Sequence, residues 1–198
     1  RGCGVSMPHK EAVIPLLDEI DPAAERIGAV NTIVNDNGKL KGYNTDYFGA
    51  KKAIEIDFPE LRRKEVLLLG AGGAAKAVAQ ALKDLECRLT VSNRTIERAE
   101  EIENRSGART VHWSDREKVK GYLLINATRV GFDNIEETPM PAEGLRNFEA
   151  VMDVVVTPTK DYDTRLIRAA KQSGLKTSVG RTMATYQSAE QFRLYTEK

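Results

Sequence analysis

The second part of the chain alternates short apolar runs with stretches in which apolar residues recur every three or four positions. The runs EVLLLG, RLTVSN, YLLINAT and AVMDVVV predict buried strands, and AAKAVAQALKD and IERAEEIENR predict helices between them. A last helix is expected over residues 183–195, with Gly174 and Gly180 as breakers before it. Because alternating strands and helices are typical of a doubly wound parallel sheet, the pattern predicts an α/β fold.

The first part of the chain has a different pattern. Pro8 suits the first position of a helix, and KEAVIPLLDEI continues with apolar residues at helical spacing, although Pro15 would interrupt one continuous helix. The segment AVNTIVNDNGKLKGYNTD predicts two strands, over 29–35 and 40–43, joined by a turn at DNG. A hairpin is therefore expected, followed by a helix that begins at about Tyr47.

A glycine-rich turn follows the first buried strand. Gly70, Gly72 and Ala75 have the spacing G-x-G-x-x-A. Such a turn lets the backbone approach a pyrophosphate, which the free N–H groups of the next helix can bind. Since a strand, a helix and a second strand about 20 residues on are all predicted, the motif indicates a dinucleotide site in a Rossmann-type domain. The alternative is a small-residue turn that only packs the helix on the sheet.

The end of the second predicted strand discriminates between two cofactors. NAD enzymes usually present an acidic side chain there to the ribose hydroxyls, whereas the 2′-phosphate of NADP needs a cation and hydrogen-bond donors. This chain has Asn93, Arg94 and Thr95 at that point, and no acid before Glu97. NADP is therefore favoured. NAD stays possible if Arg94 is a solvated loop residue and Glu97 turns toward a ribose.

Composition and charge narrow the classes of partner. Among 198 residues, 30 basic and 29 acidic side chains give a formal net charge of +1, so no nucleic acid is expected as partner. Cys3 and Cys87 are too few for a disulfide scaffold and indicate a cytoplasmic setting. The separated His9 and His112 make no metal site. No apolar run is long enough to span a membrane, so no membrane partner is expected. As further expectations, the partner is a small-molecule substrate and the protein is a monomer or homodimer.

Seven short segments, spread through nearly the whole chain, form a common pattern. They are, in order, GVSMPHK, IGAVNTIV, GYNTD, LLGAGGAAKAV, SNRT, INATRVG and MATYQSAEQF. Together they resemble the shikimate dehydrogenase family. The resemblance implies reversible reduction of 3-dehydroshikimate to shikimate, or of a closely related cyclic hydroxy acid, with NADP or sometimes NAD. It also implies an NADP-binding Rossmann domain over 51–182 and a smaller, incomplete substrate-binding domain formed by 1–50 and 183–198.

The resemblance assigns roles to individual residues. Lys10 matches the family's catalytic lysine, and Asp46 matches the aspartate that hydrogen-bonds the same substrate hydroxyl. Asn31 and Gln187 match polar ligands of the ring hydroxyls and carboxylate region, and Ser6 can offer a hydroxyl to the substrate. The positions that match cofactor contacts are Gly70, Ala71, Gly72, Gly73, Ala74, Asn93, Arg94, Thr95, Thr128, Gly180 and Met183.

The chemistry of hydride transfer explains why a lysine and an aspartate are wanted. The hydroxyl proton must leave as the hydride moves to nicotinamide, so a lysine can act as base and, in reverse, as acid. Burial would lower the pKa of Lys10 and the Asp46 carboxylate would raise it, so the sequence leaves the net direction open. Without the resemblance, Lys10 would be interpreted as a solvated side chain and Asp46 as a helix N-cap. Asn31 and Gln187 would be equally consistent with core amides, and His9 with a surface residue.

Three departures from the family bear on the substrate. Gly4 and Ser6 replace an asparagine and a threonine, and Val156 replaces a tyrosine that typically contacts substrate. Tyr47 replaces a glycine and is expected to bring a bulky ring near the cleft. These changes resemble a divergent shikimate dehydrogenase-like branch. A site that loses hydrogen-bonding groups should discriminate less well in favour of the hydroxylated ring. Quinate or aminoshikimate dehydrogenase, or a catalytically weak nucleotide-binding paralogue, are the alternatives left open.

The start of the sequence carries a further expectation. Arg1 is not a translation start, and members of the family have part of the substrate domain, including serines that hold the substrate carboxylate, before this point. The chain is therefore expected to be N-terminally truncated, to bind NADP and to turn over little shikimate.

Overall fold

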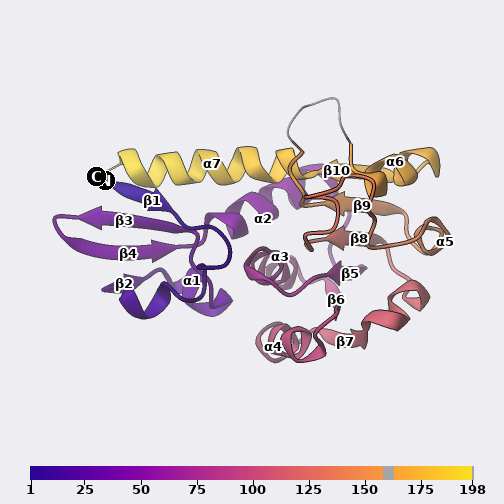
Figure 1. Cartoon of the computed structure of the whole chain (residues 1–198), viewed down its shortest axis with the longest axis horizontal. Coiled ribbons are helices and arrows are strands. Elements are labelled where there is room, and N and C mark those ends of the chain that lie inside the picture. The colour runs from indigo at the N-terminus through magenta and orange to yellow at the C-terminus, as the bar shows by residue number, and fades with distance from the viewer. Residues whose placement is uncertain (158–162, 198) are drawn as a thin grey trace.

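Six parallel strands form the larger of two sheets in the computed structural model, which describes residues 1–157 and 163–197 (Figure 1). The strand order is β10-β9-β8-β5-β6-β7. The strands are β5 (Glu65–Leu69), β6 (Arg88–Asn93), β7 (Arg109–His112), β8 (Leu123–Asn126), β9 (Ala150–Asp153) and β10 (Lys176–Val179). The predicted α/β fold with a doubly wound parallel sheet is confirmed.

Helices cover both faces of this sheet. On one face lie α2 (Thr45–Asp57), α3 (Gly73–Asp84) and α4 (Ile96–Ser106); on the other lie α5 (Ala142–Leu145) and α6 (Arg165–Gln172). Side chains of one strand alternate between the two cores. Val66 and Leu68 pack under α3, whereas Leu67 and Leu69 pack under α6. Because both faces are covered, the strands are apolar at successive positions.

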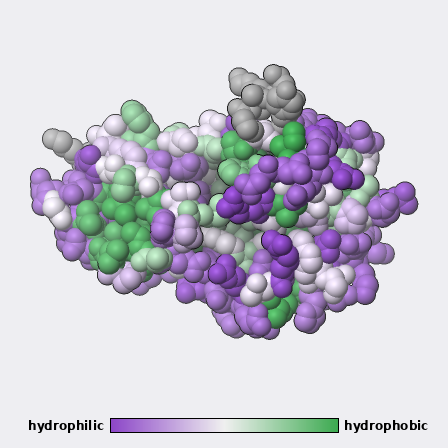
Figure 2. All heavy atoms as spheres, viewed as in Figure 1, coloured by the Kyte–Doolittle hydropathy of each residue, from purple (hydrophilic) through white to green (hydrophobic). Residues whose placement is uncertain are grey.

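The smaller sheet has four strands in the order β1-β3-β4-β2. They are β1 (Gly2–Gly4), β2 (Glu19–Ile20), β3 (Thr32–Asp36) and β4 (Lys39–Tyr43), and the helix α1 (Pro22–Ile27) follows β2. The antiparallel pair β3–β4 is the predicted hairpin, with Gly38 at a φ of 93° in its turn. Figure 2 shows hydrophobic side chains gathered over this part of the molecule, where Val5, Ile14 and Leu40 are only partly buried around a small core.

Two helices join the sheets. The last helix, α7 (Gly180–Thr196), extends from the large sheet along the small one and packs against α2 (Figure 1). The helices approach closely at Gly49, where an added Cβ would lie 2.5 Å from the Met183 carbonyl oxygen and 2.8 Å from Gln187 Cβ. Only glycine fits this contact, which brings α7 side chains over the first turn of α2.

The segment after Pro8 differs from the prediction. Residues 7–13 form turns, and the only helical piece is a 3-10 helix over Ile14–Leu16, so the expected α-helix is wrong. The Lys10 carbonyl accepts a hydrogen bond from the distant Val30 N–H at 2.8 Å, and Pro15 has no N–H with which to continue a helix. Contacts with Val30, just before β3, and with the small core therefore override the helical spacing.

Other element boundaries also shift. The C-terminal helix begins at Gly180 and not at 183, so this glycine opens the helix instead of breaking the chain before it. The sequence pattern missed α1, α6 and β10, and α2 begins two residues before Tyr47. The predicted domain limits fall inside α2 and α7, and the division into domains stays a prediction.

Candidate active site

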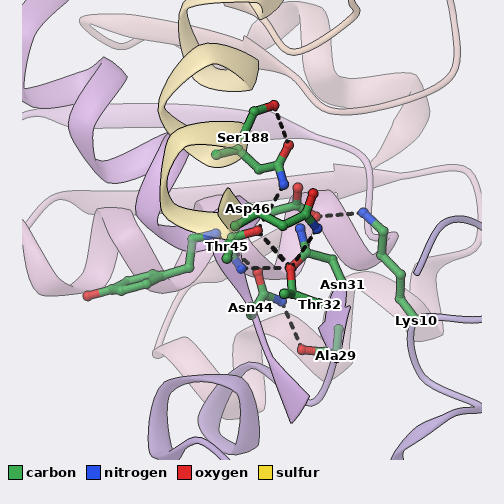
Figure 3. A network of polar contacts seen from close by, with 11 residues as sticks. Lys10, Ala29, Asn31, Thr32, Asn44, Thr45, Asp46 and Ser188 are labelled. Carbon is green, nitrogen blue, oxygen red and sulfur yellow. Dashed lines mark hydrogen bonds and ion pairs between the residues drawn. The ribbon is translucent and has the colours of Figure 1, made fainter. Parts of the chain in front are cut away.

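A lysine–aspartate pair lies between the two sheets. Lys10 Nζ is 2.6 Å from Asp46 Oδ2, and the side chains are only 16% and 12% exposed (Figure 3). Asp46 is in the first turn of α2, but the cap of that helix is Asn44, whose Oδ1 accepts from the Tyr47 N–H at 3.0 Å. Asp46 is therefore not the N-cap, and its carboxylate is available to Lys10.

A separate hydrogen-bond network next to this pair holds two of the predicted substrate ligands. Asn31 Oδ1 accepts from the Thr45 N–H at 2.7 Å and from Thr32 Oγ1 at 2.9 Å. Gln187 Nε2 donates to Thr45 Oγ1 at 2.9 Å, and Gln191 Nε2 donates to Thr32 Oγ1 at the same distance (Figure 3). The two threonines, which sequence reasoning missed, thus join β3, α2 and α7 beside Asp46. Their only sequence signal was their place inside the AVNT and NTD segments.

Ser6 is not part of this network. Its side chain is exposed, and its carbonyl accepts from the His9 N–H at 2.9 Å. His9 is exposed as well, as expected for a surface histidine. Of the predicted substrate and catalytic residues, the structure therefore brings together Lys10, Asp46, Asn31 and Gln187, and leaves Ser6 apart.

The glycine-rich turn lies next to Lys10. Gly70 has a φ of 109°, and an added Cβ would lie 2.7 Å from the Ala127 carbonyl oxygen, so the position needs glycine for both conformation and space. Gly72 precedes α3 with no side-chain cap, and a Cβ there would meet no atom within 4 Å. A Cβ on Gly73 would lie 3.0 Å from Lys10 Cδ. The open, uncapped N-terminus of α3 fits an anion such as a pyrophosphate.

The remaining predicted cofactor residues lie along the carboxyl ends of the parallel strands. Asn93 ends β6, and its Nδ2 donates to the Thr95 carbonyl at 2.8 Å, while the side chains of Arg94 and Thr95 are exposed. Thr128 follows β8, and its backbone N is 3.1 Å from the position of a Cβ on Gly70. Gly180 packs against the backbone that follows β9, and Met183 is buried in the core beside α2. Ligands of doubly wound folds bind at this edge of the sheet.

A buried carboxyl group supports the loop that carries Thr128. Asp153 ends β9 and is 1% exposed; it accepts from Asn126 Nδ2 at 2.9 Å and from Thr164 Oγ1 at 2.6 Å. Burial raises the pKa of Asp153 to about 6, against the lowering effect of these hydrogen bonds and of one from the Val155 N–H. Asn126 Oδ1 accepts from the N–H and Oγ1 of Thr128 at 3.0 and 2.7 Å. Sequence reasoning did not find this residue.

Comparisons with known proteins agree with this arrangement. The chain matches the shikimate dehydrogenase substrate binding domain over residues 1–33 and the shikimate / quinate 5-dehydrogenase family over 52–130. A protein of Thermococcus kodakarensis called shikimate dehydrogenase (NADP(+)) is 47% identical over 98% of this chain and 71% of its own length. The chain belongs to the shikimate dehydrogenase family.

Solved structures of the family have the same fold. The Thermus thermophilus shikimate 5-dehydrogenase in complex with NADP(H) and shikimate matches 100% of this chain and 74% of its own, with a TM-score of 0.88 and 39% identity. The quinate dehydrogenase of Corynebacterium glutamicum in complex with NAD matches 100% of this chain and 73% of its own, with a TM-score of 0.88 and 34% identity. Both shikimate and quinate enzymes are therefore structural relatives.

Two of the departures from the family can now be placed. The Tyr47 hydroxyl donates to Asp84 at 2.6 Å, and burial together with this carboxylate raises the pKa of Tyr47 to about 12. Asp84 ends α3, whereas Lys10 lies over its first residue, about 16 Å away along the helix. The expectation of a tyrosine ring near the cleft is therefore wrong: Tyr47 packs α2 against α3. Val156 is 44% exposed, after the end of β9.

Residues 1–157 and 163–197 have neither a metal-binding cluster nor a membrane-spanning helix. No group of three His, Cys, Asp or Glu side chains there could hold a metal ion. None of the helices in the described part of the chain is both long and apolar enough to cross a membrane.

Proposed function

We propose that this protein is an NADP-dependent dehydrogenase that interconverts shikimate and 3-dehydroshikimate. The Lys10–Asp46 pair carries the proposal, because it places a largely buried ammonium against a carboxylate directly over the first turn of α3. The name and bound ligands of the Thermus thermophilus relative support the choice of substrate and cofactor.

Lys10 is the acid–base residue of this proposal. In oxidation of the carbinol, the hydrogen on carbon leaves as hydride with the electron pair of the C–H bond. The hydroxyl hydrogen leaves as a proton, and the electron pair of the O–H bond stays behind to form the carbonyl. Bound NADP supplies the acceptor for the hydride. Neutral Lys10 accepts the hydroxyl proton on Nζ, and in reduction the ammonium returns it. Asp46, 2.6 Å from Nζ, orients the lysine and shares the substrate hydroxyl.

Asn31 and Gln187 are proposed to bind the substrate ring. Asn31 uses Oδ1 to hold Thr45 and Thr32, so its Nδ2 is the group left to donate to a hydroxyl. Gln187 extends from α7 across α2 to Thr45 and forms another wall of the same site. Ser6 is proposed as a further ligand, although its side chain makes no contact with this network.

The cofactor phosphates are proposed to bind at two helix N-termini. The backbone N–H groups from Gly70 to Ala74 would hold the pyrophosphate at the start of α3. Arg94 is exposed beside the start of α4, where its guanidinium could pair with the 2′-phosphate of NADP. The first acid after β6 is the exposed Glu97, so NADP is preferred to NAD.

A substrate and cofactor panel tests the proposal. Shikimate and quinate are each offered with NADP and with NAD, and formation of reduced nicotinamide is followed by absorbance. The fastest turnover is expected with shikimate and NADP. Turnover of quinate alone would support the second candidate, which the quinate dehydrogenase relative and the open Val156 side chain favour. Cofactor binding without any turnover would support a nucleotide-binding paralogue.

A further inference from the structure

Lys76 is a buried cation that has no role in the proposed reaction. It lies in the first turn of α3 and is 6% exposed. The positive end of the helix dipole disfavours a cation at this place, and a buried ammonium needs a charged partner. A lysine at this position is therefore unfavourable unless other groups of the protein compensate its charge.

Two carboxylates from different parts of the chain hold this ammonium. Glu11 Oε2 is 3.0 Å from Lys76 Nζ, and Glu101 Oε2 is 3.1 Å from it. Both glutamates are about half exposed, at 52% and 53%. Glu101 belongs to α4, whereas Glu11 directly follows Lys10. One ammonium thus connects the two nucleotide-side helices with the segment that carries the proposed acid–base residue.

That segment touches α3 at two points on one face. Gly73 and Lys76 are three residues apart and so lie side by side on the helix. The stem of Lys10 covers Gly73, and Glu11 binds Lys76. Residues 7–13 form turns and have no regular helix to stiffen them, and the hydrogen bond from Val30 N–H to the Lys10 carbonyl holds them on the other side. The Glu11–Lys76 ion pair, called the tie below, is therefore a polar contact that holds this segment on α3.

We propose that Lys76 is a positioning residue: through Glu11 it holds the segment that carries Lys10 against α3. In this way it keeps Lys10 Nζ on Asp46 beside the start of the nucleotide-binding helix. Glu101 supplies a second carboxylate to the buried charge without contacting the segment. The assignment rests on the proposed function for its effect on catalysis, but its effect on the segment does not.

Hydrogen exchange measured by mass spectrometry tests the position of the segment. The parent chain is compared with Lys76→Met, Glu11→Gln and Glu101→Gln, and peptides that cover residues 6–16 are followed. Loss of the tie should speed exchange in Lys76→Met and Glu11→Gln by about fivefold. Glu101→Gln also removes one carboxylate charge from beside the Lys76 ammonium, but its exchange rate over residues 6–16 should stay within about twofold of the parent. Lys76→Arg should restore most of the protection, since it keeps the cation.

Steady-state kinetics on the same variants test the catalytic consequence. In Lys76→Met and Glu11→Gln, kcat should fall while the KM for NADP stays within about twofold, because the glycine turn is untouched. Equal exchange in Glu11→Gln and Glu101→Gln would overturn the proposal, as would unchanged exchange in both Lys76→Met and Glu11→Gln. If Lys76→Met does not fold, the comparison of exchange rates in Glu11→Gln and Glu101→Gln alone tests the proposal. If the parent chain has no turnover, only the proposed function is contradicted. The exchange rates still test whether Lys76 holds the segment that carries Lys10 against α3.

Discussion

Replacing Gly49 by alanine should destabilise the protein through the contact between α2 and α7. The new Cβ would lie 2.5 Å from the Met183 carbonyl oxygen and 2.8 Å from Gln187 Cβ, which are fixed to the α7 backbone. No change of rotamer relieves these overlaps, so the helices must separate. Overpacking of this kind costs about 3 kcal/mol, and the better helix propensity of alanine recovers about 1 kcal/mol. The free energy of unfolding should fall by about 2 kcal/mol, and the Tm by about 4–8 °C.

Thermal and urea unfolding measure this loss against a matched control. Gly144→Ala is also a glycine in a helix, but the nearest atom to its new Cβ is the flexible Met140 Sδ, so its unfolding should change by less than about 1 kcal/mol. In Gly49→Ala the KM for shikimate should also rise, because Gln187 can no longer reach Thr45. A Gly49→Ala variant that melts at or above the parent Tm would refute the close contact.

Two further predictions concern charge. Asp153 has a pKa of about 6 in the folded protein against an ordinary 3.8, so the folded state keeps a proton that the unfolded state has lost. The stability of the parent relative to Asp153→Asn should therefore fall by about 2 kcal/mol as the pH rises from about 4 to about 6, and urea unfolding that shows a constant difference would contradict this. Arg94→Ser should weaken NADPH binding about tenfold or more and leave NADH binding nearly unchanged in fluorescence titrations; equal losses for both cofactors would exclude a contact with the 2′-phosphate.

The larger sheet was predictable because local and global preferences agree. A run such as EVLLLG is apolar at every position, and the structure buries β5 on both faces. The glycine turn followed from its spacing, and the hairpin followed from the residues DNG. The first segment misled the prediction, since its helical spacing competes with Pro15 and with the long-range bond between Val30 and Lys10.

The site could be predicted only in part, because its residues meet through the fold. Lys10 and Asp46 are 36 positions apart, and no periodicity connects them. The family resemblance named the pair, and the capping by Asn44 explains why Asp46 is available. The burial of Lys76 depends on a loop and on a second helix, so a single helical pattern cannot reveal it. Contacts of this kind become visible only once the elements are packed.

The most direct measurement of the proposed chemistry compares Lys10→Ala with the parent chain. The rate of NADPH formation from shikimate and NADP is measured together with the Kd for NADPH, which fluorescence titration gives. Loss of the acid–base group should lower kcat by about 10²- to 10⁴-fold, and the Kd should stay within about twofold. Equal rates in the two proteins, or a fall in rate that a weaker Kd for NADPH explains, would contradict the role of Lys10.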